Sequence, residues 1–311
     1  STRPWSRGSV ASVMKSFASW RAVGVPVALA SLLAVSPCRA EAPDPARAVE
    51  TPRPHELEEV LPPGAELSGH EVYDRLFKNR KRLRTVVEVG RILSKDPAGN
   101  PQRTDFELRA KDYRGPDDQP TDGVFAKVVI TLTGPRDLEH TGYLYVHRSD
   151  RADDQFIYSP MRKRVARANL RGQNVAGTDF SFDDFLTTLD DLEQASYRRL
   201  PDEVVDGVPC YVVEATMAKT SRSRYSRSVA AIEKEHYVPL RTRYWDDVGV
   251  AVKELRAPRK SLKEFDGVWV PTESTMTDLL EDTSSTVTLE KVDPNPALED
   301  SEFNTAALER N

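Results

Sequence analysis

The sequence predicts a mainly β protein in which the strands form one strongly curved antiparallel sheet, a half-open β-barrel with helices lining or plugging its concave side. Roughly a dozen segments place apolar residues at alternate positions, and turn sequences separate them at the spacing of about 8–12 residues that all-β folds show. Helical segments do not alternate regularly with these strands, which argues against a parallel α/β sheet. Because so many strands cannot remain flat, we expect the sheet to curve.

The first forty residues have the composition of an export signal. They contain five basic residues and no acidic ones, with Lys15 and Arg21 before an uncharged apolar stretch, residues 22–36. This stretch is shorter than the roughly 20 residues that a membrane-spanning helix needs. Small residues at Cys38 and Ala40 suit cleavage directly afterwards. We therefore interpret residues 1–40 as a leader extension and a Sec-type signal peptide, with an uncleaved anchor as the alternative.

The two cysteines carry separate predictions. Cys38 raises the question of lipidation, but Pro37 replaces the small residue expected before a lipidated cysteine, so ordinary cleavage is favoured. The sequence leaves open whether Cys38 is lipidated or removed. Cys210 is then the only cysteine of the mature chain, which excludes an internal disulfide. Its strand-like surroundings predict a small buried hydrophobic residue.

Residues 41–64 are rich in proline, alanine and glutamate and are predicted to form an extended tether. The remaining residues, 65–311, are predicted to form a single domain, a length that an all-β fold can reach without division.

The first predicted helix follows Ser68, which forms a capping box with Glu71. Apolar side chains recur along it at helical spacing; they are Val72, Tyr73, Leu76 and Phe77. The helix ends in a basic run, residues 78–84. Such a run is usually a solvated helix end, but it could also contact an acidic partner or a lipid head group.

Beyond residue 85 the apolar period changes from helical to alternating, which predicts strands. In the first strand, Val87, Val89 and Leu93 are predicted to share one face, with Glu88 and Gly90 on the other. The further predicted strands are residues 106–111, 126–132, 143–146, 156–159, 163–168, 210–216, 226–234, 240–245, 250–255, 268–271, 272–279 and 286–292.

A second helix is predicted in the middle of the chain, in Gly177-Thr-Asp-Phe-Ser-Phe-Asp-Asp-Phe-Leu186. Ser181 is the predicted N-cap, and Asp184 completes its capping box. Phe180 and Phe185 occupy the two positions of a hydrophobic staple. The predicted apolar face of this helix consists of Phe182, Phe185, Leu186 and Leu189.

Charge and motifs argue against several classes of function. The formal net charge is −5, and without residues 1–40 there are 39 basic against 49 acidic residues, which argues against nucleic acid binding. The chain has no nucleotide-binding loop, nucleophile elbow or zinc-protease motif. Its five histidines are scattered, and its Asp-Asp pairs lie at turns and helix ends where aspartate is favoured locally. We therefore predict no cofactor, no metal site, no catalytic residue and no enzymatic activity.

The residues alone leave two interpretations of the apolar strand faces open. One is a core filled with side chains, as in small barrels. The other is a hydrophobic cavity large enough for acyl chains, with the central helix as its lid.

The order of these features resembles the outer-membrane lipoprotein-sorting (LolA-like) superfamily, and most of all its larger members, which are often paired with RND-type exporters. The resemblance covers roughly residues 65–311 and rests first on Asp-Phe-Ser-Phe-Asp-Asp, residues 179–184. Two further segments carry it, Asp-Gly-Val-Trp-Val-Pro at residues 266–271 and the closing segment, residues 294–303. No motif places the ligand-gating arginine of the small carrier on any arginine here.

The resemblance implies a periplasmic carrier, possible also at the outer membrane, that binds lipid or lipoprotein acyl chains and passes them between membranes. An RND-type inner-membrane transporter or an outer-membrane acceptor would be its partner. The proposed lid residues are Phe180, Phe182, Phe185 and Leu186. The proposed lining residues are Phe106, Leu108, Val128, Ile130, Tyr143 and Tyr211. Two alternatives stay open, a sensor or interaction module that docks on a membrane protein and, less favoured, a hydrolase with an unrecognised carboxylate pair.

Overall fold

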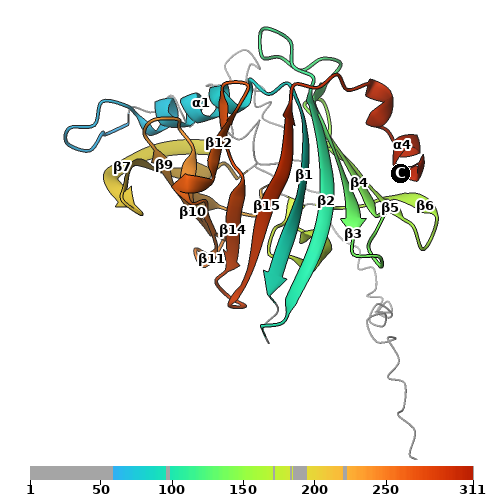
Figure 1. Ribbon diagram of the computed structural model, residues 1–311. Coiled ribbons are helices and arrows are strands. Elements are labelled where there is room, and N and C mark those ends of the chain that lie inside the picture. Colours follow the sequence, from blue (N-terminus) through green and yellow to red (C-terminus); the bar gives the residue numbers. More distant parts are fainter. Residues whose placement is uncertain are drawn as a thin grey trace, which may run out of the picture. The chain divides into compact units, whose positions relative to one another are not determined.

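A single large antiparallel sheet dominates the computed structural model (Figure 1). The structure describes residues 59–95, 99–170, 172–182, 184, 195–219 and 223–310. Within these ranges thirteen strands pair in the order β6-β5-β4-β3-β2-β1-β15-β14-β11-β10-β9-β8-β7. The predicted signal peptide and most of the predicted tether lie outside the described residues.

Most strands pair with a neighbour in the chain, so the sheet is built largely from consecutive hairpins. The first half contains β1 (Thr85–Lys95), β2 (Pro101–Asp112), β3 (Val124–Gly134), β4 (Gly142–Arg148), β5 (Asp154–Ser159) and β6 (Arg164–Arg167). The second half contains β7 (Ala195–Val205), β8 (Val208–Met217), β9 (Arg227–Glu233), β10 (Pro239–Trp245), β11 (Ala251–Arg256), β14 (Glu273–Asp278) and β15 (Thr283–Pro294). A separate hairpin consists of β12 (Leu262–Phe265) and β13 (Val268–Pro271).

The sheet curves strongly but does not close. Its two edge strands are β6 and β7, and no pairing joins them in the described part of the chain. Thirteen twisted strands cannot lie flat, and the accumulated twist bends the sheet around one face. The predicted fold class, a mainly β protein with a curved, open antiparallel sheet, is confirmed.

One face of this sheet, which we call the inner face, carries the largest apolar cluster. Directly opposed residues of antiparallel strands share a face, so the pairs Glu88 with Leu108 and Leu108 with Ile130 place all three there. The buried members of the cluster are Ile92, Phe106, Leu108, Ile130, Leu132, Tyr143, Leu170, Val175, Phe180, Phe182 and Met276. We call residues 172–182, which contain the short 3-10 helix η3 (Val175–Gly177), the covering segment.

Helix α1 (Gly69–Arg80) packs on the inner face of the other half of the sheet. The predicted capping box is present, because the Ser68 hydroxyl accepts from the Glu71 N–H and the Glu71 carboxylate accepts from the Ser68 N–H. Its buried residues contact Val213 and Ala230. Cross-strand pairs lead from Val213 through β9 and β10 to β11, so α1 and the covering segment lie on the same face.

Strand β1 turns its predicted apolar face, which includes Leu93, away from the inner face. Ile92 is 1% exposed on the inner face, whereas Leu93 is 46% exposed. Glu88 therefore points inward. The strand also carries a bulge against β15 at Gly90, where a Cβ would lie 2.6 Å from the Thr288 carbonyl oxygen. Only glycine permits this close approach of two backbones.

Three elements were not predicted, and each has a local reason. Strand β7 contains Pro201 and several charged residues, which a central strand would not tolerate but an edge strand does. Strand β12 has only four residues. Helix α4 (Thr305–Arg310) is short and covers the outer face near β4, where Leu308 and Phe303 contact Leu144 (Figure 1).

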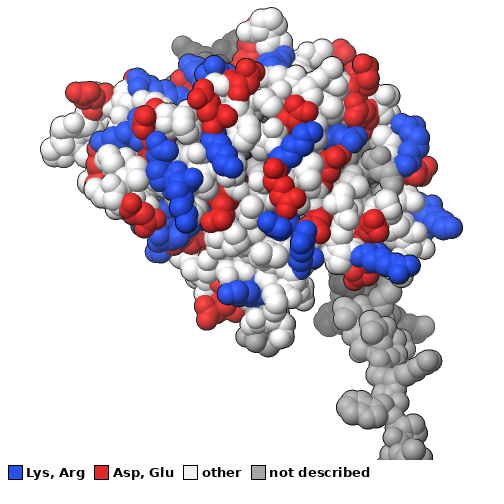
Figure 2. Space-filling view, viewed as in Figure 1, with Lys and Arg blue, Asp and Glu red and all other residues white. Residues whose placement is uncertain are grey.

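The face seen in Figure 2 carries intermingled positive and negative side chains. Ion pairs link neighbouring strands, as between Arg91 and Glu290, where Nη1 and Oε1 are 3.1 Å apart. Arg243 and Glu254 form a similar pair across β10 and β11, at 2.5 Å. Among the helices of the described residues, none is long and apolar enough to cross a membrane.

Candidate ligand-binding hollow

A hollow of about 190 Å³ lies on the inner face, where the end of α1 approaches β1, β2 and β3. We call this space the hollow. Its apolar walls are Leu83, Val86, Leu108, Ala110, Ala126, Val128, Val268 and Val270. Charged residues complete the lining; they are Arg80, Arg84, Glu88, Lys111, Asp112 and Asp184. The hollow therefore has a mixed lining, in which strands β1 and β2 contribute charged as well as apolar residues.

The structure brings together most of the residues predicted to line a cavity. Phe106, Leu108, Ile130 and Tyr143 are buried in one cluster on the inner face, and Val128 packs against them half-buried. Leu108 and Val128 also line the hollow. Whether these residues contact a ligand stays a prediction.

Tyr211 lies apart from that group. It packs against the cluster beneath α1, and the cationic groups of Arg199 and Lys234 lie over its ring. Tyr211 also lies on the inner face, but its strand, β8, is six strands away from β1 in the sheet. The even spacing of the predicted strands gave no sign of this distance.

The predicted lid residues divide between described and undescribed parts of the chain. Phe180 and Phe182 are 4% and 3% exposed and pack in the inner-face cluster. The rings of Phe182 and Tyr143 have centroids 4.8 Å apart. Phe185 and Leu186 lie outside the described residues. In this structure, then, the covering segment fills much of the inner face itself.

The size of the hollow bears on both interpretations of the apolar face. At about 190 Å³ it is smaller than the roughly 300–1,000 Å³ of typical ligand pockets. A whole long acyl chain would therefore require the covering segment to move. Within the described residues, side chains fill much of the inner face and leave this residual hollow.

A buried polar network ties the covering segment to the sheet. The Ser285 hydroxyl donates to Asp179 Oδ2 at 2.6 Å, and the Thr283 hydroxyl donates to Asp179 Oδ1 at 2.5 Å. The Lys253 ammonium donates to the Asp179 carbonyl oxygen. Because aspartate and lysine are rarely buried unless paired, this network fixes where the segment lies. Sequence reasoning did not identify Lys253 or Asp179 as anchors.

Asp184 extends the same network. It accepts hydrogen bonds from the Ser181 N–H at 2.7 Å and the Ser181 hydroxyl at 2.8 Å, the first of which is one half of the predicted capping box. The Tyr225 hydroxyl donates to its other oxygen at 2.8 Å. Lys253 Nζ lies 3.7 Å from Asp184 Oδ2. Burial lowers the pKa of Lys253, although the charge of Asp184 opposes that shift.

Arg80 and Glu88 both line the hollow. The side chain of Arg80 is exposed, and that of Glu88 is half-buried. Desolvation by nearby protein atoms lowers the pKa of Arg80 and raises the pKa of Glu88, and the opposite charge of each partner offsets part of these shifts. An arginine remains protonated despite such a shift, whereas a buried carboxyl tends toward its neutral form.

Most of the basic run 78–84 is engaged within the protein. Lys78 pairs with Asp74 at 2.7 Å, and Lys81 pairs with Asp118. Arg82 donates to the Gly267 carbonyl oxygen at 3.1 Å. A docking surface formed by this run stays a prediction, with fewer free charges than the sequence suggested.

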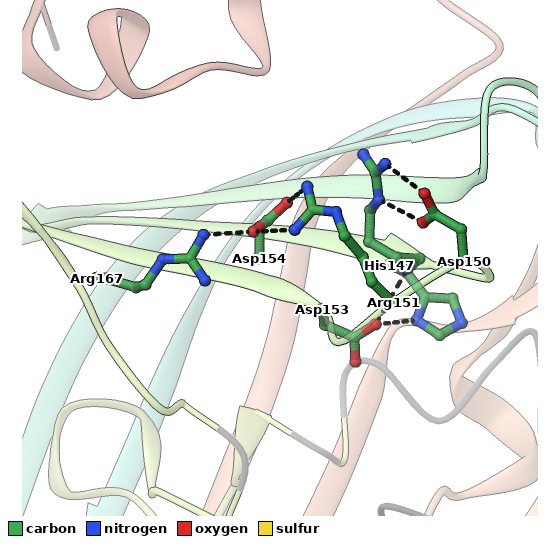
Figure 3. A network of polar contacts seen from close by, with 7 residues as sticks. His147, Asp150, Arg151, Asp153, Asp154 and Arg167 are labelled. Carbon is green, nitrogen blue, oxygen red and sulfur yellow. Dashed lines mark hydrogen bonds and ion pairs between the residues drawn. The ribbon is translucent and has the colours of Figure 1, made fainter.

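A second polar cluster lies at the β4–β5 hairpin (Figure 3). Asp153 Oδ1 is 3.0 Å from His147 Nδ1, and its other oxygen accepts from the Tyr145 hydroxyl at 2.5 Å. Arg151 and Arg167 both donate to Asp154. Asp153 and Asp154 thus clamp the hairpin and the neighbouring strand β6. An Asp–His pair also occurs in catalytic triads, but such a triad needs a nucleophile as well.

The Asp153 cluster predicts acid sensitivity. Burial alone would raise the pKa of Asp153, but hydrogen bonds from His147, Tyr145 and the Arg148 N–H outweigh it and hold the pKa well below its usual range. A lowered folded-state pKa stabilises the fold above about pH 4 and loses that contribution as the pH falls. Asp153→Asn should lower the free energy of unfolding by about 1.5–3 kcal/mol at pH 7.

The measurement is urea unfolding at pH 7 and at successively lower pH. The difference between Asp153→Asn and the unsubstituted chain should shrink as the pH falls below about 4. Asp150→Asn is the matched control, because Asp150 pairs with Arg148 at the surface of the same hairpin and should matter much less. A difference that persists unchanged at low pH would contradict this assignment.

The remaining candidates for chemistry are weaker. Cys210 is fully buried, as predicted, and burial raises the pKa of its thiol to about 11, which makes it a poor nucleophile. Across the described ranges, no group of three or more His, Cys, Asp or Glu side chains is placed to hold a metal ion.

Comparison with solved structures identifies similar folds. The outer membrane lipoprotein-sorting protein domain from Vibrio parahaemolyticus is 23% identical, with a TM-score of 0.68, over 78% of this chain and 98% of that one. A DUF1329 family protein from Desulfovibrio piger is 23% identical, with a TM-score of 0.69, over 78% and 99%. A LolA superfamily protein from Nitrosomonas europaea is 15% identical, with a TM-score of 0.61, over 78% and 99%.

Sequence comparison adds the family. Among curated proteins, none matches the chain. A family model described as uncharacterized protein-like matches residues 126–310, more than half of the chain. This chain has the LolA-like fold that the sequence predicted, and it belongs to the family which that model describes.

Proposed function

We propose that this protein is a periplasmic carrier that binds acyl chains of lipids or lipoproteins against the inner face of its sheet. The observation that carries the proposal is that one segment of the chain covers that face. A single segment, anchored by Asp179, closes the apolar surface where a second sheet would otherwise be needed. A cover of this kind can leave without dismantling the sheet.

The energetics suit reversible binding. Each buried CH₂ contributes about 0.8 kcal/mol, so a long chain would be held firmly, while displacement of the covering segment would offset part of that gain. The protein would thus take up and release its cargo instead of retaining it. We further propose transfer to or from an RND-type transporter or an outer-membrane acceptor, with residues 41–64 as the tether and without enzymatic turnover.

Native mass spectrometry of the mature chain, purified from lysate with its membranes, tests this function. A phospholipid or acylated peptide at defined stoichiometry, identified after organic extraction, is the expected result. A ligand-free mass, together with failure to bind a fluorescent fatty-acid probe, would overturn the carrier function. Pull-down of a membrane protein partner would then favour the interaction module instead.

A further inference from the structure

Exposed apolar side chains gather at one end of the curved sheet. Nine large apolar side chains are exposed in the described part of the chain, and five of them lie on three turns at this end. The five are Met161, Val248, Val250, Leu279 and Leu280, with exposed fractions from 40% to 91%. Single exposed apolar residues are normal on a protein surface, but a group of them marks a site of interaction.

Strand pairing places the three turns at the same end of the sheet, which we call the turn rim (residues 160–163, 246–250 and 279–282). The end of β5 pairs with the start of β4, and the start of β11 pairs with the end of β14. Because every neighbouring pair in the sheet is antiparallel, the β5–β6, β10–β11 and β14–β15 turns all lie at this end. Strands β14 and β15 meet there at the lower edge of the molecule in Figure 1.

Side-chain hydrogen bonds hold the β10–β11 and β14–β15 turns in place. Asp246 Oδ1 accepts from the Val248 N–H at 3.1 Å, and Asp278 Oδ1 accepts from the Leu280 N–H at 2.9 Å. An aspartate that accepts from the N–H two residues later stabilises a tight turn. Val248 and Leu280 are therefore 77% and 63% exposed on ordered turns, and contact with an apolar environment would remove the cost of their hydration.

The third turn carries cations without partners. Arg162, Lys163 and Arg164 directly follow Met161, which is 91% exposed, and all three side chains are exposed as well. Within the residues that the structure describes, none of the three forms an ion pair or a side-chain hydrogen bond. A basic group beside an apolar side chain fits the surface of a bilayer, where lipid phosphates border the acyl chains.

The two apolar turns carry charges of the other sign. Asp247, Glu281 and Asp282 are exposed beside the apolar side chains. These carboxylates would weaken attraction to an anionic surface at their end of the turn rim. Apolar contact must therefore dominate at the β10–β11 and β14–β15 turns, and charge must dominate at the β5–β6 turn.

We propose that the turn rim docks on a phospholipid bilayer, with Val248, Leu280 and Met161 entering the head-group region and the cations of the β5–β6 turn contacting lipid phosphates. Four strands, β4 to β1, separate the basic turn from the β14–β15 turn, a distance of about 25 Å along the sheet. A bilayer is broad enough to contact turns that lie so far apart, and its phosphates and acyl chains match both kinds of side chain.

The turn rim lies beside the anchor of the covering segment. Thr283 and Ser285, at the start of β15, both donate to Asp179. Docking would thus bring the cover of the inner face to the lipid surface. The inference does not depend on cargo, because a chain that docks but holds no lipid would keep this surface and lose the carrier function. Native mass spectrometry detects the cargo, whereas the experiment below detects docking.

Flotation with lipid vesicles tests the docking. The mature chain carries Cys38→Ser in every variant, so that no lipid attached there contributes. Vesicles of phosphatidylcholine alone are compared with vesicles in which one quarter of the lipid is phosphatidylglycerol. We expect the chain to bind both kinds, the anionic vesicles about tenfold more tightly, and high salt to remove that gain. Failure to float with either kind would overturn docking on a bilayer and leave the turn rim to a protein partner.

The apolar turns are tested by substitution. Val248→Ser together with Leu280→Ser should weaken binding to both kinds of vesicle by about tenfold or more, because two apolar side chains no longer leave water. Val204→Ser is the matched control, since Val204 is 68% exposed near the end of β7, at the opposite end of the sheet. It should bind like the unsubstituted chain. Equal binding of the double variant and the control would overturn the proposal.

The basic turn is tested by removing its charge. Arg162→Gln, Lys163→Gln and Arg164→Gln together should abolish the preference for anionic vesicles and its dependence on salt, and leave binding to phosphatidylcholine within a few-fold. All these positions are exposed, so circular dichroism should show unchanged folding. A preference for anionic vesicles that persists in the triple variant would overturn the contact between this turn and lipid phosphates.

Discussion

Lys253→Met should destabilise the protein by about 3–5 kcal/mol, the cost of removing one member of a buried charged pair. Lys253 is 1% exposed, donates to the Asp179 carbonyl oxygen and lies 3.7 Å from Asp184. Methionine fills a similar volume but leaves both acceptors without the ammonium. Because the network joins the covering segment to β11 and β15, the loss should appear in the cooperative unfolding of the whole sheet.

Urea unfolding followed by circular dichroism measures this effect. Lys291→Met is the matched control, since Lys291 lies on β15 with a largely exposed side chain 3.9 Å from Asp293 and should change stability little. In the double variant Lys253→Met with Asp184→Asn, part of the loss should return, because the charge of Asp184 is then no longer left uncompensated. Equal stability of the two single lysine variants would show that the network does not hold the segment.

The position of Lys253 also shows what sequence periodicity could and could not predict. In strand β11, Lys253 has the same parity as Leu255, so alternation places both on the inner face. A lysine at an alternate position is nevertheless usually interpreted as solvated. Its partner Asp179 lies 74 residues away, and only the folded chain reveals that pairing.

Strand β1 shows a related difficulty. Its outward positions Val87 and Val89 are apolar and its inward position Glu88 is charged, so the usual pattern is reversed there. Strands β2 and β3 follow the usual pattern, with Leu108 and Ile130 buried on the inner face. The one place where alternation misleads is therefore the wall of the hollow, where a charged residue faces inward.

In the central stretch, residues 177–186, the local sequence was sufficient to predict part of the structure. The Ser181–Asp184 interaction depends on residues three positions apart and was predicted from the sequence. The second role of Asp184, as an acceptor for Tyr225 and a neighbour of Lys253, depends on strands that follow much later. Local spacing predicts where a helix starts, whereas long-range packing determines which distant residues contact that start.

Phe182→Ala should both destabilise the protein and strengthen the binding of a single-chain lipid probe. Phe182 is 3% exposed against Tyr143, and truncation of a buried phenylalanine costs about 3–5 kcal/mol. The same ring occupies inner-face space that an acyl chain would need. A protein whose binding-competent form is rarely populated binds weakly in proportion, so a less costly opening should raise the apparent affinity by about tenfold or more.

The control for this prediction is Phe303→Ala, because Phe303 is 2% exposed in the cluster beneath α4 on the opposite face of the sheet. Its truncation should cost similar stability and leave probe binding unchanged, which separates a local effect from general loosening. Affinity is measured by probe titration at a temperature where circular dichroism shows both variants folded. Unchanged binding in Phe182→Ala would mean that the covering segment does not compete with the chain. Weaker binding would instead place Phe182 against the bound chain, as expected of a lid, and the segment would then act as part of the site rather than as its competitor.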